Sequence, residues 1–240
     1  MPTQIFLAID TTNVSTAAAQ AASTRDTVAG IKLGLEFFAA NGPGGVRTVA
    51  SSGAPLFLDL KLHDIPNTVA GAVRAVVPLR PALLTVHASG GAAMLRAAVD
   101  AAGEAAAKTG AARPRLVAVT VLTSLAEAEL DDIGQRGPIA DQARRLAALA
   151  RNCGLDGVVC SPHEIEALRA ECGSGFLLVV PGIRPASTGV GDQKRVMTPA
   201  EAARRGADYL VIGRPITAAD DPAAAARRIA AEVAAAAPAA

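Results

Sequence analysis

Eight short apolar segments recur along the 240-residue chain, and each is followed by a stretch with helix signals. Apolar runs of this length are typical of strands buried in a parallel sheet. A regular strand–helix alternation predicts an α/β fold, and eight units predict a closed (β/α)8 or TIM barrel, with an open doubly wound sheet as the alternative. The expected strands are residues 5–10, 28–34, 57–62, 83–88, 115–124, 157–161, 176–183 and 208–213.

The intervening segments are rich in alanine, which has the highest helix propensity. Thr198-Pro-Ala-Glu201 predicts a helix start, because it has the Ser/Thr-x-x-Glu pattern of a capping box. Composition does not change sharply along the chain, so residues 1–240 are expected to form a single domain. Other helices are expected over residues 16–25, 35–40, 46–52, 68–78, 91–109, 139–152, 162–171 and 220–236, with a break at residues 41–45.

The charge balance argues against a nucleic-acid or membrane partner. Lys and Arg number 23 against 22 Asp and Glu, which gives a net charge of +1. A nucleic-acid binder would show a basic stripe with stacking aromatics, but this chain has no Trp, one Tyr and five Phe. The apolar run at residues 5–10 lacks a basic flank and is too short for a signal peptide or a membrane span. We therefore expect a cytoplasmic protein.

The cysteines and histidines are scattered. Three cysteines without a C-x-x-C spacing predict small buried side chains in a reducing compartment, in preference to a metal or redox site. No metal site is expected from the histidines either, because they show no paired ligand spacing. These residues are Cys153, Cys160, Cys172, His63, His87 and His163.

Residues 57–68 place charged side chains in an otherwise apolar strand, with the sequence Phe-Leu-Asp-Leu-Lys-Leu-His-Asp-Ile-Pro-Asn-Thr. Side chains alternate across a strand, so Phe57, Asp59 and Lys61 share one face and three leucines share the other. Burying a charge costs on the order of several kcal/mol unless it is paired or used. Asp59 and Asp64 bracket Lys61 and keep its ammonium protonated. The segment is interpreted as functional, with a structural ion pair as the alternative.

Polar residues also fall at the ends of the other expected strands. In a (β/α)8 barrel the C-terminal strand ends meet at one face, so these side chains are expected to form one site. Gly213 and Arg214 are predicted to bind a phosphate group. The loop 185–193 contains glycines and is predicted to form a lid over the site. The converging residues are Asp10, Lys32, Asp59, Lys61, Thr123, Ser124, Arg184 and Arg214.

The segment from Asp59 to Thr68 closely resembles the signature of the orotidine 5'-phosphate decarboxylases. Further matching motifs follow in the same order over nearly the whole chain: Ala8-Ile-Asp10, Ile31-Lys-Leu-Gly34, Val119-Thr-Val-Leu-Thr-Ser124, Pro181-Gly-Ile-Arg-Pro185, Asp192-Gln193 and Val211-Ile-Gly-Arg-Pro-Ile216. The resemblance implies decarboxylation of orotidine 5'-monophosphate to UMP and carbon dioxide, the last step of de novo UMP synthesis, without a cofactor or metal. It also implies a homodimer with its sites at the subunit interface.

The resemblance further implies a role for each matching residue. Lys61 would deliver the proton to C6 of the pyrimidine, with Lys32 and Asp59 completing the charged array. The partner chain would contribute Asp64, Ile65 and Thr68. Asp10 would hold the ribose hydroxyls, together with Lys32 and the partner's Asp64. Thr123 and Ser124 would meet the pyrimidine, and Pro181 belongs to the substrate-binding set. Arg184, Gln193, Gly213 and Arg214 would bind the phosphate or close over it.

Two alternatives remain open. A magnesium-dependent sugar-phosphate decarboxylase of the same superfamily would share the Asp-x-Lys-x-x-Asp strand, but the His-Asp-Ile-Pro-Asn-Thr continuation favours the nucleotide enzyme. A non-catalytic barrel that binds a phosphorylated ligand would need no charged array. The presence of Lys32, Asp59, Lys61 and Asp64 together argues against it.

Overall fold

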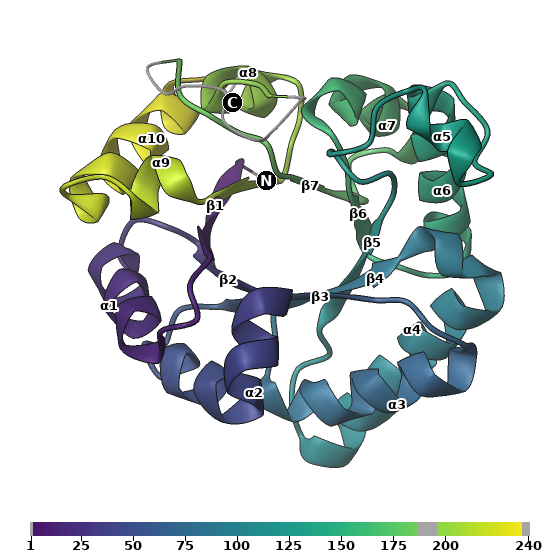
Figure 1. Ribbon diagram of the computed structural model, residues 1–240, viewed down its shortest axis with the longest axis horizontal. Coiled ribbons are helices and arrows are strands. Elements are labelled where there is room, and N and C mark those ends of the chain that lie inside the picture. Colours follow the sequence, from purple (N-terminus) through teal and green to yellow (C-terminus); the bar gives the residue numbers. More distant parts are fainter. Residues whose placement is uncertain (1, 187–195, 237–240) are drawn as a thin grey trace.

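The computed structural model describes residues 2–186 and 196–236, and its eight parallel strands close into a barrel (Figure 1). The strands follow one another around the barrel in chain order, and the last pairs with the first. The (β/α)8 prediction is confirmed, and the open-sheet alternative is wrong. The strands are β1 (Gln4–Ile9), β2 (Gly30–Gly34), β3 (Leu56–Leu62), β4 (Leu83–His87), β5 (Arg115–Val119), β6 (Gly157–Val159), β7 (Leu177–Val180) and β8 (Tyr209–Ile212).

Each predicted strand overlaps an observed one, but two of the predictions run three residues or more too far at their C-terminal ends. The strand predicted to reach Ser124 ends at Val119, and the one predicted to reach Ile183 ends at Val180. In both cases the apolar residues continue past the last paired residue because they line the cavity at the barrel mouth, as Val121 and Ile183 do. Hydrophobicity alone does not separate a strand from an apolar rim.

Helices surround the barrel in a ring (Figure 1), and those in the described part of the chain lack the combination of length and hydropathy that crossing a membrane requires. Three short 3₁₀ helices supplement them: η1 (Val77–Leu79), η2 (Ala88–Gly90) and η3 (Pro162–Glu164). The α-helices are α1 (Val14–Thr24), α2 (Leu35–Ala50), α3 (Pro66–Val76), α4 (Gly91–Thr109), α5 (Glu129–Asp132), α6 (Ile139–Asn152), α7 (Ile165–Cys172), α8 (Pro199–Arg204), α9 (Arg214–Thr217) and α10 (Pro222–Ala236).

The predicted break at residues 41–45 is present within α2. Gly42 leaves the helical conformation with φ 57° and ψ −164°, and a second helical stretch begins at Pro43. A proline directly after the kink is tolerated, because its missing N–H would have no partner in the first turn of a helix. The glycine-rich segment therefore separates two helical stretches, and the second begins a few residues earlier than predicted. Thr198 caps α8 as predicted, since its side chain accepts a hydrogen bond from the Glu201 backbone N–H.

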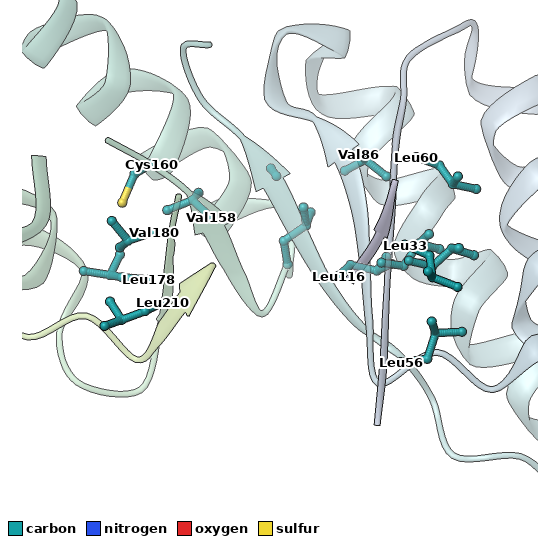
Figure 2. Close-up of a cluster of buried hydrophobic side chains, with 14 of the residues drawn as sticks. Leu33, Leu56, Leu60, Val86, Leu116, Val158, Cys160, Leu178, Val180 and Leu210 are labelled. Carbon is teal, nitrogen blue, oxygen red and sulfur yellow. The ribbon is translucent and has the colours of Figure 1, made fainter. Parts of the chain in front are cut away.

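The barrel has an outer and an inner apolar layer. The outer layer packs the strands against the helices, and Figure 2 shows members of it such as Leu33, Leu60, Val158 and Leu210. The inner layer fills the barrel, where Phe57 packs edge-on against Phe6 at 5.7 Å between ring centroids. Its residues occur along the whole length of the strands, from Leu83 and Leu177 at strand starts to Val179 and Val211 near strand ends.

Candidate active site

A cavity of about 350 Å³ lies at the C-terminal end of the barrel, bordered by residues of the inner apolar layer. Its walls come from strand ends and from the loops that follow them. Ten of the residues predicted from the sequence line it, although they are spread over about two hundred positions of the chain. They are Asp10, Lys32, Asp59, Lys61, Thr123, Ser124, Pro181, Arg184, Gly213 and Arg214.

The cavity contains an alternating series of acidic and basic groups centred on Asp59. Its Oδ2 atom accepts a hydrogen bond from Lys61 Nζ at 2.8 Å and lies 3.6 Å from Lys32 Nζ. Lys32 Nζ also lies 3.5 Å from Asp10 Oδ1. The side chains of Lys32 and Asp59 are only 11% and 12% exposed, while that of Lys61 is 30% exposed. Lys61 is thus the ammonium of the pair with more access to the cavity.

Asp59 stays ionised in this setting. Burial opposes its charge, but the two neighbouring ammonium groups and the hydrogen bonds from Lys61 and Thr85 outweigh the burial, so the pKa of the Asp59 carboxyl lies below its ordinary value. The Asp59 carboxylate thus stays charged between the two lysine side chains. The array is therefore a set of fixed charges at neutral pH, which can stabilise charge that develops on a bound molecule.

The pairing of strands β2 and β3 explains how these charges meet. Lys32 is the third residue of β2, and the pairing of Gly34 with Asp59 brings the ends of β2 and β3 together. In β3, Leu58 and Leu60 pack in the outer apolar layer, whereas Asp59 and Lys61 line the cavity. The alternation expected from the sequence is thus present. Lys61 has a positive φ of 50°, which is rare for a residue other than glycine.

A second cationic region lies where β7 and β8 end. Arg184 follows β7, and Arg214 is the first residue of α9. Burial and the nearby positive charge of Arg214 together lower the pKa of the Arg184 guanidinium. Two guanidinium groups that repel each other are stabilised by an anion between them, and a phosphate offers oxygens to both.

Two backbone features hold this region in place. A parallel bridge joins Ile183 to Met197, and the Arg184 N–H donates to the Met197 carbonyl oxygen at 3.0 Å. The two ends of the loop between β7 and α8 are therefore tied together. At Gly213 an added Cβ would lie 3.4 Å from Ala8 and 3.5 Å from Asp10 Oδ2, which are ordinary contact distances. The end of β8 thus packs directly against residues at the end of β1.

Three predicted residues lie outside the cavity of their own chain. Asp64, Ile65 and Thr68 are exposed on the segment that leads from β3 into α3. The Asp64 carboxylate accepts a hydrogen bond from the Ile65 backbone N–H, and Ile65 is 66% exposed. Gln193 and residues 187–193 of the predicted lid fall outside the described residues.

Sequence reasoning missed the apolar part of the cavity wall. Three of its residues could have been found from the strand alternation, because Ala8, Phe57 and Val211 lie two positions before Asp10, Asp59 and Gly213. Val119 and Val159 end strands without a predicted site residue two positions later, and the loops after the strands follow no period. The missed wall residues are Ala8, Phe57, Val119, Val121, Leu122, Val159, Cys160, Gly182, Ile183, Val211 and Pro215.

Two histidines form a stacked pair near the array. The rings of His63 and His87 lie 5.3 Å apart with an interplanar angle of 26°. Burial, the nearby His63 and the Lys61 ammonium lower the pKa of His87 to about 4. His87 is therefore neutral at physiological pH. In the described part of the chain, no group of three or more His, Cys, Asp or Glu side chains is arranged to hold a metal ion.

Comparison with known proteins identifies the family of the chain. The profile of the orotidine 5'-phosphate decarboxylase / HUMPS family matches residues 3–229. An orotidine 5'-phosphate decarboxylase from Paramagnetospirillum magneticum is 60% identical over 95% of this chain and 97% of its own. Another from Rhodospirillum rubrum is 61% identical over 95% of this chain and 93% of its own.

A solved structure is similar over the same extent. The crystal structure of orotidine 5'-phosphate decarboxylase from Lactobacillus acidophilus superposes with a TM-score of 0.84 at 37% identity, covering 96% of this chain and 99% of that one. Sequence and fold thus agree over nearly the whole length. The chain belongs to the orotidine 5'-phosphate decarboxylase / HUMPS family.

Proposed function

We propose that this protein decarboxylates orotidine 5'-monophosphate to UMP and carbon dioxide, the last step of de novo UMP synthesis. The activity is that of its relatives at 52–61% identity, which are carboxy-lyases of this name. The observation that carries the assignment of roles is the charged series Asp10, Lys32, Asp59 and Lys61, which shares one cavity with two arginines.

The chemistry of the reaction explains why fixed charges are needed. When the bond between C6 and the carboxylate breaks, its electron pair stays at C6, where no adjacent π system absorbs it. The site must therefore stabilise a localised negative charge. In our proposal the Lys61 ammonium lies beside C6, stabilises the developing charge and then transfers a proton to the carbon. Lys61 regains a proton from solvent, and the cycle uses no cofactor and no metal.

In our proposal Asp59 holds Lys61 in place. The Asp59 carboxylate binds the Lys61 ammonium, and the nearby Lys32 ammonium helps to balance the negative charge of Asp59. Asp59 would also oppose the carboxylate of the substrate and favour its departure as neutral carbon dioxide. Asp64 of a partner chain completes the array in this proposal.

Substrate binding is divided among the remaining residues. Arg184 and Arg214, with Gly213 and Gln193, bind the phosphate, and the two guanidinium groups supply the charge. Asp10 and Lys32 hold the ribose hydroxyls. Thr123, Ser124 and Pro181 contact the pyrimidine. Binding energy gained at the phosphate, far from the reacting carbon, drives closure of the loop 185–193 and helps to orient C6 against Lys61.

We further propose that the enzyme is a homodimer. Asp64, Ile65 and Thr68 belong to the family motif yet are exposed and lie outside the cavity of their own chain. A two-fold symmetric pair would let each chain insert this segment beside the neighbour's site and would cover the exposed Ile65. Cys153, Cys160 and Cys172 are all free thiols, which supports a cytoplasmic location.

A spectrophotometric assay of orotidine 5'-monophosphate loss, with and without EDTA, tests the function. We expect turnover that is unaffected by the chelator. Activity that depends on magnesium and acts on a sugar phosphate would favour the alternative decarboxylase. Tight UMP binding with no turnover would indicate a binding protein. Either result would overturn the proposal.

A further inference from the structure

The end of β3 departs from regular pairing with its neighbour β4. Leu58 lies opposite Leu84 and Leu62 lies opposite Val86, so residues 59–61 face Thr85 alone. The extra residues form a bulge, and bulges of this kind often aim side chains at a site. Both Asp59 and Lys61 lie in this bulge. The positive φ of Lys61 belongs to the same distortion.

Thr85 fills the position opposite the bulge with two hydrogen bonds. Its Oγ1 atom accepts from the Lys61 backbone N–H at 2.8 Å and donates to Asp59 Oδ1 at 3.0 Å. The side chain of Thr85 is fully buried, and Thr85 is not among the residues that line the cavity. It therefore acts on the two charged residues without contacting the space that a substrate would occupy.

The polarity of these bonds is fixed by chemistry. A backbone N–H can only donate, so Thr85 Oγ1 must accept from Lys61 and has its single proton left for Asp59. Because that proton engages Oδ1, the Oδ2 atom of Asp59 is turned toward Lys61 Nζ at 2.8 Å and Lys32 Nζ at 3.6 Å. One hydroxyl thus determines which oxygen of the carboxylate meets the ammonium groups.

We propose that Thr85 is a positioning residue for proton delivery. It holds the backbone of Lys61 in its left-handed conformation and orients the carboxylate that binds the Lys61 ammonium. The inference rests on the proposed function of Lys61. It adds a residue that the charged motif does not contain, on a neighbouring strand, and it predicts that catalysis depends on a buried hydroxyl that does not contact the substrate.

A second buried threonine provides a matched control. Thr120 directly follows β5 and is 2% exposed, and its Oγ1 atom donates to the Val159 backbone carbonyl at 3.2 Å. Thr120 resembles Thr85 in its burial and in its position near the strand ends, but its hydroxyl hydrogen-bonds to the backbone and not to a charged side chain. Replacing each threonine by valine keeps its shape and removes its hydroxyl.

The experiment compares Thr85→Val, Thr85→Ser and Thr120→Val with the wild type. Turnover of orotidine 5'-monophosphate gives kcat and KM, and calorimetry gives the Kd of UMP. For Thr85→Val we expect kcat to fall roughly 10- to 100-fold, as for a catalytic group displaced by about an ångström, with KM and the UMP Kd within about threefold. Thr85→Ser restores the hydroxyl and keeps kcat within about threefold, and Thr120→Val keeps the wild-type kcat.

The inference is overturned if Thr85→Val turns over at the wild-type rate, if it raises KM while kcat is unchanged, or if Thr120→Val loses as much kcat. If Thr85→Val does not fold, Thr85→Ala carries the same expectation and the same criteria. The assay of the wild type distinguishes a failure of the proposed function from a failure of the proposed role of Thr85. A wild type without turnover refutes the proposed function, whereas a fully active Thr85→Val refutes only the role of Thr85.

Discussion

Both ends of the barrel contain acid–base pairs, but the two sets of pairs differ in their hydrogen bonding. At the N-terminal end, Asp156 and Asp208 directly precede β6 and β8, and each pairs with an arginine. The carboxylate of Asp208 also accepts the Leu178 backbone N–H at 2.7 Å, and that of Asp156 accepts the Leu116 N–H at the same distance. Each carboxylate thus ties the preceding strand to its own.

At the C-terminal end one carboxylate is shared between two ammonium groups. Asp59 Oδ2 faces both Lys61 and Lys32, and the exposed part of Lys61 opens on the cavity. An ammonium has three protons to donate, and one of those of Lys61 is bound to Asp59. Arg169, by contrast, donates to Gly173, Phe176 and Gly206 as well as to Asp208. An ion pair whose hydrogen-bond donors are all used within the protein stabilises the fold. An ion pair that still has donors facing a cavity can act on a ligand.

The largest effect should follow from Lys61→Ala. We expect kcat/KM to fall at least ~10³-fold, equivalent to about 4 kcal/mol, because the proton donor and the charge that stabilises the carbanion are both lost. UMP should still bind to the variant. The free energy of unfolding should not decrease, since Asp59 keeps its ion pair with Lys32. Steady-state kinetics and urea unfolding measure the two quantities. A nearly wild-type rate would remove Lys61 from the proposed mechanism.

Asp208→Ala should show the opposite pattern. Removing one partner of a largely buried pair leaves Arg169 uncompensated, so we expect a loss of roughly 3 kcal/mol in the free energy of unfolding. The kcat of the folded fraction should stay within about twofold of wild type, because Asp208 lies at the other end of the barrel. Asp156→Ala is the matched comparison. Its loss should be smaller, since the side chains of Arg113 and Asp156 are 34% and 27% exposed. Equal losses would show that burial does not set the strength of these pairs.

Within the C-terminal end, Arg214→Ala separates the binding of the substrate phosphate from the decarboxylation step. We expect KM for orotidine 5'-monophosphate to rise roughly 10- to 100-fold, because a charged contact to the phosphate is lost. Turnover of the unphosphorylated nucleoside should hardly change. Parallel assays of both substrates test this. Equal impairment of the two would mean that Arg214 does not bind the phosphate.

The smallest effect concerns pH. His87 has a folded-state pKa of about 4 against an ordinary 6.5, so the unfolded chain takes up its proton first as the pH falls. The stability that neutral His87 contributes is present above pH 6.5 and is lost progressively down to about pH 4. Because His87 is only partly buried and faces His63, Lys61 and Asp59, we expect its protonation to lower the free energy of unfolding by about 1 kcal/mol.

Urea unfolding at pH 7 and pH 5 measures this loss in the wild type and in His87→Asn. The variant should lose less stability on acidification than the wild type does. His163→Asn serves as the control, because His163 is exposed on η3, away from the stacked pair. If His87→Asn and the wild type had the same pH dependence, His87 would not be the group responsible.

Much of this arrangement could be predicted from the sequence, for identifiable physical reasons. The strand alternation of Phe57, Asp59 and Lys61 indicates which side chains enter the barrel, and eight strand–helix units favour its closure over an open sheet. The positions of Asp10, Arg184 and Arg214 follow from the rule that strand ends meet at one face. Local pattern alone did not reveal Thr85, because an inward threonine in an apolar strand looks like any buried residue. Its role depends on a bulge in the neighbouring strand, which is a property of the pairing.

Proton exchange at C6 of UMP tests the central claim most directly. Because catalysis of protonation at C6 implies catalysis of the reverse step, an enzyme that stabilises the carbanion should exchange the C6 hydrogen of bound UMP in D₂O. Nuclear magnetic resonance follows the loss of that signal. We predict exchange with the wild type and none above background with Lys61→Ala, although UMP binds to both. Exchange by Lys61→Ala at the wild-type rate would contradict the account.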